Sequence, residues 1–139
     1  MTSYVVDACV VVKWFIPEVH TQSAVKLLES ENDLFVPDLL YPELGNVIWK
    51  KVRKKELDVA IAQEILWGMQ KMSLEILSSK PLLSAAFDIA DSLDRSVYDS
   101  IYLAAACDQD TVLVTADLKF YNAIFRSALK DNILWIEDL

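Results

Sequence analysis

Short runs of β-branched and other apolar residues alternate along the chain with longer segments whose apolar positions recur every three or four residues. This alternation is typical of an α/β domain with a largely parallel sheet. We expect strands at residues 4–7, 34–36, 74–77, 111–115 and 133–136. We expect helices from the first strand to about residue 15, at 20–30, 58–72, 82–93 and 97–107, and between the last two strands. No linker, repeat or low-complexity segment interrupts this order, so residues 1–139 are expected to form one domain.

Two of the predicted helices have distinctive apolar patterns. A long helix is predicted to open at Pro37-Asp38, with Pro42 in its first turn, where the missing N–H would have no partner anyway. Its apolar stripe includes Leu40, Leu44, Val47 and Ile48. The helix at 97–107 is apolar on every face from residue 101 onward, so it must be buried.

Hydrophobic residues make up 54% of the chain, with a mean hydropathy of +0.27. Either the core is well filled or a partner covers part of an apolar surface, and the composition leaves both open. The start of the chain lacks a secretory pattern, and no run approaches the roughly 18 apolar residues of a membrane span, so a cytoplasmic location without membrane contact is expected. Cys9 and Cys107 are predicted to be reduced, buried small hydrophobes.

Charge and composition exclude several kinds of site. Thirteen basic and 21 acidic side chains give a net charge of −8, which repels a polyanion, so any nucleic-acid function needs cations. With only Gly45 and Gly68, the chain cannot build a dinucleotide fingerprint or a phosphate-binding Walker loop. The single histidine, His20, excludes zinc sites made of several imidazoles. If the protein is an enzyme, carboxylates must carry the chemistry.

Two aspartates stand at strand ends. Asp7 ends the first predicted strand, and Asp117 follows the strand at 111–115. Each could simply cap the helix that follows it. Because parallel strands end at one edge of the sheet, where ligands bind, the pair also predicts a site there.

Glu43 and Asp99 are candidates from helices. Glu43 borders the apolar stripe of the long helix beside Asn46, although it could equally be a solvated flank residue. Asp99 heads the buried helix and is expected to be drawn inward, but a capping box with Ser96 fits the same pattern.

Four carboxylates in one cleft would repel one another by roughly 3 kcal/mol per pair at about 5 Å and an effective dielectric near 20. A divalent cation removes this cost, and hard oxygen ligands suit Mg²⁺ or Mn²⁺. Such a cation would also attract phosphate to an acidic protein.

These residues together resemble the PIN domain. The resemblance lies in Val5-Val6-Asp7-Ala8, Pro42-Glu43 with Asn46, Tyr98-Asp99, and Thr115-Ala116-Asp117 with Phe120. It covers essentially the whole chain, and the length and order of elements are similar to the toxins of VapBC-type toxin–antitoxin pairs. Cys9 departs from the family pattern, in which Ser or Asn often stands two residues after the first aspartate.

The resemblance implies a three-layer α/β/α sandwich with a mainly parallel sheet and a metal-dependent endoribonuclease. It implies that Asp7, Glu43, Asp99 and Asp117 hold one or two Mg²⁺ or Mn²⁺ ions, with Thr115 orienting Asp117 or a metal-bound water and Asn46 supporting Glu43. The implied partners are the RNA substrate, a cognate antitoxin and a second copy of the chain.

Two further groups of residues each have two possible interpretations. The run Lys50, Lys51, Arg53, Lys54 and Lys55 is either favourable charge at a helix C-terminus or a track for the RNA backbone. Trp14, Trp49, Trp67 and Tyr41 either pack in the core, which we favour for most of them, or form a groove for a partner.

The alternatives in function are an RNA-processing nuclease outside a toxin–antitoxin system, a catalytically silent module of the same fold, and a Mg²⁺-dependent phosphatase or receiver-type domain. Such a phosphatase would carry Asp-x-Asp after the first strand, where Asp7-Ala8-Cys9 stands.

Overall fold

The computed structural model describes residues 2–29 and 31–139. Within this range the strands form one parallel sheet in the order β3-β2-β1-β4-β5. They are β1 (Thr2–Val6), β2 (Asn32–Pro37), β3 (Glu75–Leu77), β4 (Val112–Thr115) and β5 (Ile133–Trp135). All five predicted strands are present, and β1 and β4 lie side by side at the centre, with Val5 paired to Leu113. The carboxyl ends of these two strands therefore meet at one edge of the sheet.

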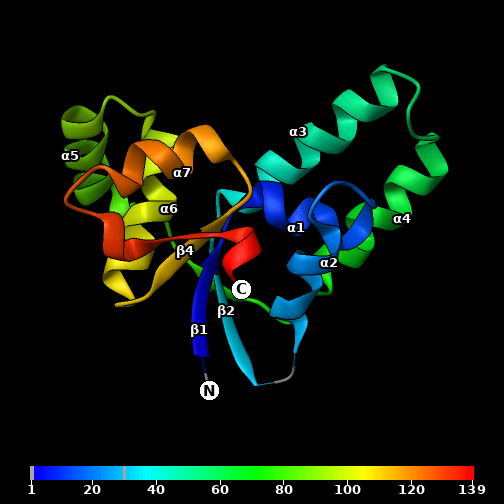
Figure 1. Cartoon of the computed structure of the whole chain (residues 1–139). Coiled ribbons are helices and arrows are strands. Elements are labelled where there is room, and N and C mark those ends of the chain that lie inside the picture. The colour runs from blue at the N-terminus through cyan, green and yellow to red at the C-terminus, as the bar shows by residue number, and fades with distance from the viewer. Residues whose placement is uncertain (1, 30) are drawn as a thin grey trace.

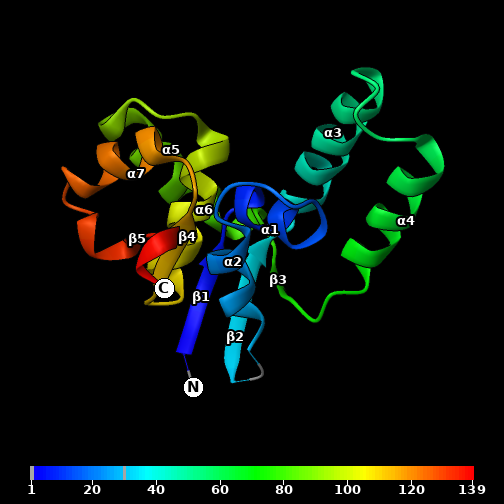
Figure 2. The same ribbon diagram turned by 45° about the vertical axis from the view of Figure 1, so that its right-hand side comes forward.

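Helices cover both faces of the sheet (Figures 1 and 2). On one face lie α5 (Leu83–Leu93), α6 (Val97–Asp108) and α7 (Leu118–Phe125), with α6 packed against β1, β2 and β4. On the other lie α1 (Ala8–Phe15), α2 (Thr21–Ala24), α3 (Leu40–Arg53) and α4 (Val59–Gln70). Single 3₁₀ turns complete the chain: η1 (Val25–Leu28), η2 (Lys80–Leu82), η3 (Lys130–Asn132) and η4 (Ile136–Asp138). The predicted three-layer α/β/α sandwich is confirmed.

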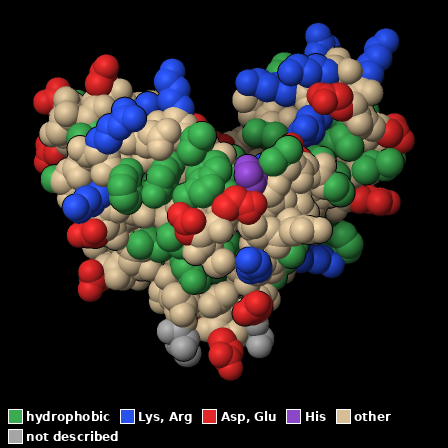
Figure 3. All heavy atoms as spheres, in the orientation of Figure 1, with side chains coloured by type: hydrophobic (Ala, Val, Ile, Leu, Met, Phe, Trp, Pro, Cys, Tyr) green, Lys and Arg blue, Asp and Glu red, His purple; other side chains and the backbone are tan. Residues whose placement is uncertain are grey.

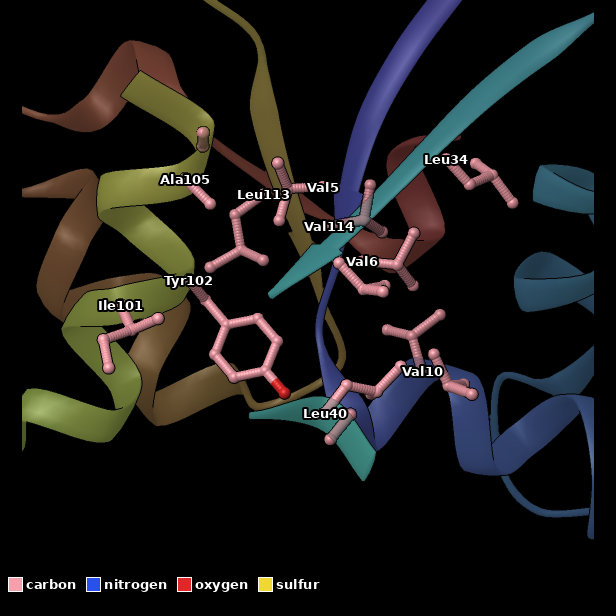
Figure 4. Close-up of a cluster of buried hydrophobic side chains, with 14 of the residues drawn as sticks. Val5, Val6, Val10, Leu34, Leu40, Ile101, Tyr102, Ala105, Leu113 and Val114 are labelled. Atoms are coloured by element: carbon pink, nitrogen blue, oxygen red, sulfur yellow. The ribbon is translucent and has the colours of Figure 1, made fainter. Parts of the chain in front are cut away.

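The core lies between the central strands and α6. Val5, Val6, Leu113 and Val114 have no exposed surface, since helices cover them on both sides. Residues 101–106 of α6 are buried, as the all-round apolar pattern predicts, and Figure 4 shows the Tyr102 and Ala105 side chains of this helix pointing toward the sheet. The prediction that Cys107 is buried is wrong, because this residue of the last turn of α6 is exposed.

The structure corrects two helix boundaries. The segment predicted as one helix at 20–30 is a short α-helix, α2, that continues as the 3₁₀ turn η1 and ends at Leu28, and Ser30 lies outside the described residues. The long helix begins at Leu40 rather than at Pro37-Asp38. Strand β2 runs through Pro37, and the Asp38 amide then donates to the Leu77 carbonyl at 2.8 Å, which keeps this segment paired with β3.

The helices α3 and α4 pack against each other and form a hairpin that projects away from the sheet (Figure 1). Leu40, Leu44 and Ile48 are buried as predicted. Trp49 and Trp67 are 57% and 63% exposed, so core packing is wrong for both, because their sides of the hairpin face no other element.

The other two aromatic residues of the predicted set are half-buried. The indole Nε1 of Trp14 donates to the Ala24 carbonyl at 2.8 Å, and Tyr41 packs against the edge of the core. In the described part of the chain, no helix has the length and apolar character needed to cross a membrane.

Candidate active site

The four predicted carboxylates line one hollow of about 280 Å³ at the carboxyl edge of the sheet. This acidic hollow is lined by Asp7, Ala8, Cys9, Glu43, Asn46, Val47, Asp99 and Asp117. It opens where the molecule is notched between the α3–α4 hairpin and the lobe of α5 and α7 (Figure 3). Carboxylates from four segments, at least 18 positions apart in the sequence, therefore meet at one place in the fold.

Asp7 sits at the junction of β1 and α1 and is fixed by two side chains. The Thr115 hydroxyl donates to its Oδ2 at 2.8 Å, and the Cys9 thiol donates to the same oxygen at 3.3 Å. Asp7 occupies the N-cap position of α1 but makes no side-chain capping bond there, so the capping interpretation is wrong for this residue. Its oxygens are held toward the hollow instead.

Thr115 links the two strand-end aspartates. Its side chain is fully buried at the end of β4, and besides donating to Asp7 its Oγ1 accepts a hydrogen bond from the Asp117 amide at 3.1 Å. The hydroxyl thus fixes the Asp7 carboxylate and the backbone at Asp117. The Asp117 side chain also caps α7, since its Oδ1 accepts from the Phe120 amide at 3.1 Å. For Asp117, capping and a place in the hollow are compatible.

Glu43 reaches the hollow from the first turn of α3. Its Oε1 accepts a 2.6 Å hydrogen bond from the hydroxyl of Tyr102, a side chain that is 2% exposed. Figure 4 shows the Tyr102 ring crossing from α6 toward Leu40 at the start of α3. Asn46, the predicted support of Glu43, lines the hollow, but within the described residues it forms no hydrogen bond to Glu43.

Tyr102 was missed by the sequence reasoning. In a helix that is apolar on every face, a tyrosine looks like one more core residue, and its partner lies 59 residues away. The one signal available was its spacing, because Tyr102 stands three residues after Asp99 and therefore lies on the same side of α6. A buried phenol also needs a hydrogen-bond partner, and a nearby carboxylate is a good one.

Asp99 lines the hollow, and its amide is bonded by the N-cap of α6. The Ser96 hydroxyl accepts a 3.0 Å hydrogen bond from the Asp99 amide, so Ser96 is the N-cap of α6. The Asp99 carboxylate is half-exposed, lines the hollow and forms an ion pair with Arg95 at 3.7 Å.

The proton affinities of these groups reflect crowded, poorly solvated negative charge. Burial raises the pKa of Asp7 to about 6, and the charges of Asp99 and Glu43 add to this, while the bonds from Thr115 and Cys9 oppose it. Burial also raises the pKa of Glu43, against the opposing bond from Tyr102. Burial raises the pKa of Asp99, with Arg95 opposing. The hollow is therefore electrostatically unfavourable until positive charge enters it.

Cys9 has a defined place in this network. Burial and the neighbouring Asp7 charge raise the pKa of its thiol, so the thiol stays protonated and can donate to Asp7. Its sulfur accepts from the Ala116 amide at 3.4 Å. The thiol thus supports Asp7, although its bond to Asp7 is longer than a hydroxyl would make.

Within the part of the chain that the structure describes, no three His, Cys, Asp or Glu side chains are gathered tightly enough to form a preformed metal cluster. The carboxylates line the hollow without converging on one point. Their donor atoms are nevertheless all oxygen, which suits a hard divalent cation that keeps several of its waters.

Comparison with known proteins agrees with this fold. The model of the PIN domain matches residues 4–125. Ribonuclease VapC3 from Pyrobaculum aerophilum is 30% identical over 116 residues, which cover 81% of this chain and 88% of that protein.

Two solved structures share the fold. The crystal structure of PAE2754 from Pyrobaculum aerophilum superposes with a TM-score of 0.73 at 26% identity, covering 99% of this chain and 85% of that one. A toxin–antitoxin complex from Klebsiella pneumoniae contains a chain with a TM-score of 0.65 at 13% identity, covering 94% of this chain and 95% of that one.

Proposed function

The chain belongs to the PIN domain family, and from this premise we propose that it is an endoribonuclease that hydrolyses RNA phosphodiester bonds with Mg²⁺ or Mn²⁺. The observation that carries the proposal is the single hollow lined by Asp7, Glu43, Asp99 and Asp117, which come from four separate segments. The curated relative at 30% identity, a ribonuclease by name, supports the choice of substrate.

The residues of the hollow fit a hard divalent cation. Their donors are carboxylate oxygens, and burial raises the pKa of Asp7, Glu43 and Asp99, a cost of negative charge that a cation would offset. Asp7, Glu43, Asp99 and Asp117 would hold one or two ions. When bound, such ions supply Lewis-acid activation of water and offset the charge that develops on the phosphate.

The chain's own contribution is to hold the carboxylates in place. Thr115 and Cys9 fix one oxygen of Asp7, and Tyr102 fixes one oxygen of Glu43. Thr115 and Tyr102 do not line the hollow, whereas Cys9 does, so the first two donors leave the hollow free for a ligand. Such supporting partners commonly change metal affinity or activity by about 10- to 100-fold when they are removed.

We also propose that the protein is the toxin of a toxin–antitoxin pair, active in the cytoplasm. The toxin–antitoxin complex from Klebsiella pneumoniae supports this through its shared fold. The α3–α4 hairpin exposes Trp49, Val59, Ile61 and Trp67, an apolar surface that an amphipathic antitoxin helix would cover.

A second set of exposed apolar residues supports a homodimer. Leu83 and Phe87 on α5 and Leu118 and Phe125 on α7 are each more than half exposed. Light scattering of the purified protein tests this, because a dimer would double the mass of 15.8 kDa.

The deciding experiment is cleavage of a mixed-sequence single-stranded RNA by purified protein in Mg²⁺, Mn²⁺ or EDTA, with Asp99→Asn as control. We expect cleavage with either cation and none in EDTA or in the variant. No cleavage by folded protein free of a bound inhibitor would contradict the proposal and favour a catalytically silent module. Calorimetric titration with Mn²⁺ also distinguishes the ribonuclease from the silent module, because a silent module should show no Mn²⁺ binding that depends on Asp99.

A further inference from the structure

A second hollow adjoins the acidic one and has the opposite charge. This basic hollow has a volume of about 240 Å³ and is lined by Val47, Lys50, Lys51, Lys54 and Glu56. Val47 also lines the acidic hollow, so the two are contiguous along α3. The whole chain has a net charge of −8. Three lysines beside a carboxylate site are therefore more positive charge than its surface carries on average.

Helix geometry places the lysines in line with Glu43. At about 100° per residue, Lys50 lies about 20° short of two full turns beyond Glu43, and Lys54 about 20° past three turns. At about 1.5 Å per residue, they stand roughly 10 Å and 16 Å farther along the axis. A row of two cations therefore starts at the edge of the acidic hollow and follows one side of α3.

Two of the three lysines have no carboxylate partner in the described part of the chain. Lys51 forms an ion pair with Glu18 at 3.9 Å, whereas neither Lys50 nor Lys54 is in an ion pair. Glu56 lines the same hollow but does not come within ion-pair distance of either. Lys and Arg side chains gather on both rims of the notch in Figure 3. Favourable charge at the end of α3 would need neither the alignment with Glu43 nor the shared hollow.

We propose that the basic hollow binds phosphates of the RNA strand on one side of the scissile bond, with Lys50 and Lys54 as the contacting cations. This rests on the proposed ribonuclease function and adds a direction to the bound strand. At about 3.4 Å per nucleotide of a stacked strand, the two lysines correspond to roughly three and five nucleotides from the metal site. Phosphate contacts of this kind set register and affinity but not sequence preference.

The test compares RNA binding by three proteins, each carrying Asp99→Asn so that the RNA stays intact. They are the single variant, the same protein with Lys50→Gln and Lys54→Gln, and a matched control with Lys26→Gln and Lys130→Gln. Lys26 and Lys130 are exposed and precede β2 and β5, at the opposite edge of the sheet. Fluorescence anisotropy of a labelled 12-nucleotide single-stranded RNA gives the affinity at several salt concentrations.

Each phosphate contact in a single strand contributes about 0.7 to the slope of log K against log salt. Losing two contacts should flatten the slope by about 1.4. Between 50 and 200 mM salt, the affinity of the parent should therefore fall about 7-fold more than the affinity of the variant that lacks Lys50 and Lys54. The control should keep the parent's slope. Lengthening the RNA by about five nucleotides on one end should improve binding only where Lys50 and Lys54 are present.

Equal slopes in the three proteins, or no measurable binding of RNA, would overturn the proposal. Cleavage of the same RNA by the protein without any substitution, in Mn²⁺ and in EDTA, is read separately. Cation-dependent cleavage together with equal slopes would leave the ribonuclease standing and assign the lysines to the charge of the helix end alone.

Discussion

Replacing Asp7 by Asn should stabilise the metal-free protein. In the structure Asp7 Oδ2 accepts hydrogen bonds from Thr115 and Cys9, and the amide oxygen of Asn can accept both. The substitution therefore removes the charge and keeps the contacts. Because the carboxylate is poorly hydrated and lies near Glu43 and Asp99, its charge opposes folding when no cation is bound.

The magnitude follows from the pKa of Asp7, which is raised from 3.8 to about 6 in the folded protein. At about 1.36 kcal/mol per pH unit, this difference corresponds to at most about 3 kcal/mol of lost stability. Solvent screening reduces the value, since the side chain is partly exposed at the mouth of the hollow.

The pH dependence has a definite sign. Between about pH 4 and 6 the folded protein binds more protons at Asp7 than the unfolded chain does, so the contribution of Asp7 to stability falls as pH rises. Below this range both states are protonated and the cost disappears. Above it both are ionised and the cost is complete.

The assay is urea unfolding in EDTA from pH 4 to 8, comparing wild type, Asp7→Asn and Asp91→Asn, an exposed carboxylate on α5. We expect Asp7→Asn to be more stable than wild type at pH 7.5, by up to about 3 kcal/mol, and the two to converge near pH 4. Asp91→Asn should follow wild type.

Adding Mn²⁺ should reverse the order of Asp7→Asn and wild type. A ligand at 1,000 times its Kd stabilises the folded state by about 4.1 kcal/mol, which exceeds the deficit of up to about 3 kcal/mol, and only wild type keeps the full carboxylate set. If Asp7→Asn proved no more stable than wild type in EDTA at pH 7.5, the reasoning that burial makes this charge costly would be refuted.

Three other substitutions follow from the same contacts. Tyr102→Phe removes the hydroxyl that holds Glu43 and should weaken Mn²⁺ binding by about tenfold or more in a calorimetric titration. The free energy of unfolding should change by no more than about 3 kcal/mol. An unchanged Mn²⁺ affinity would assign Tyr102 to packing alone. Ser96→Ala removes the N-cap of α6 and should cost about 0.5–2 kcal/mol in urea unfolding, while Ser96→Thr, which keeps a hydroxyl, should recover most of it. Cys9→Ser should give Asp7 a shorter, stronger hydrogen bond and shift the pH dependence of Mn²⁺ binding to lower pH, and a shift to higher pH would contradict this.

The strand and helix order could be read from the sequence because it depends on local periodicity. The alternation of β-branched runs and helical segments predicted all five strands, and the all-round apolar pattern after Ser100 predicted the buried part of α6. The placement of Asp7 and Asp117 was also predictable from local pattern. Both stand at the ends of strands, and the strands of a parallel sheet end at the same edge.

Local pattern failed where a long-range contact decides the outcome. Exposed Trp49 and Trp67 look like core residues by type, and only the projection of the α3–α4 hairpin away from the sheet leaves them uncovered. The later start of α3 depends on a hydrogen bond from Asp38 to Leu77, a residue of another strand. Cys107 is exposed in the last turn of α6, directly after a run of buried residues, which its apolar neighbours along the chain do not predict.

The sequence by itself determined which residues could serve as acids and which of them end strands, because these depend on residue type and on neighbours along the chain. Only the tertiary structure decided how each acid is held. Glu43 is fixed by Tyr102 and Asp7 by Thr115, partners 59 and 108 residues away. Such pairs are set by how α3, α6 and β4 pack around the sheet, and no periodicity within one segment encodes the position of another.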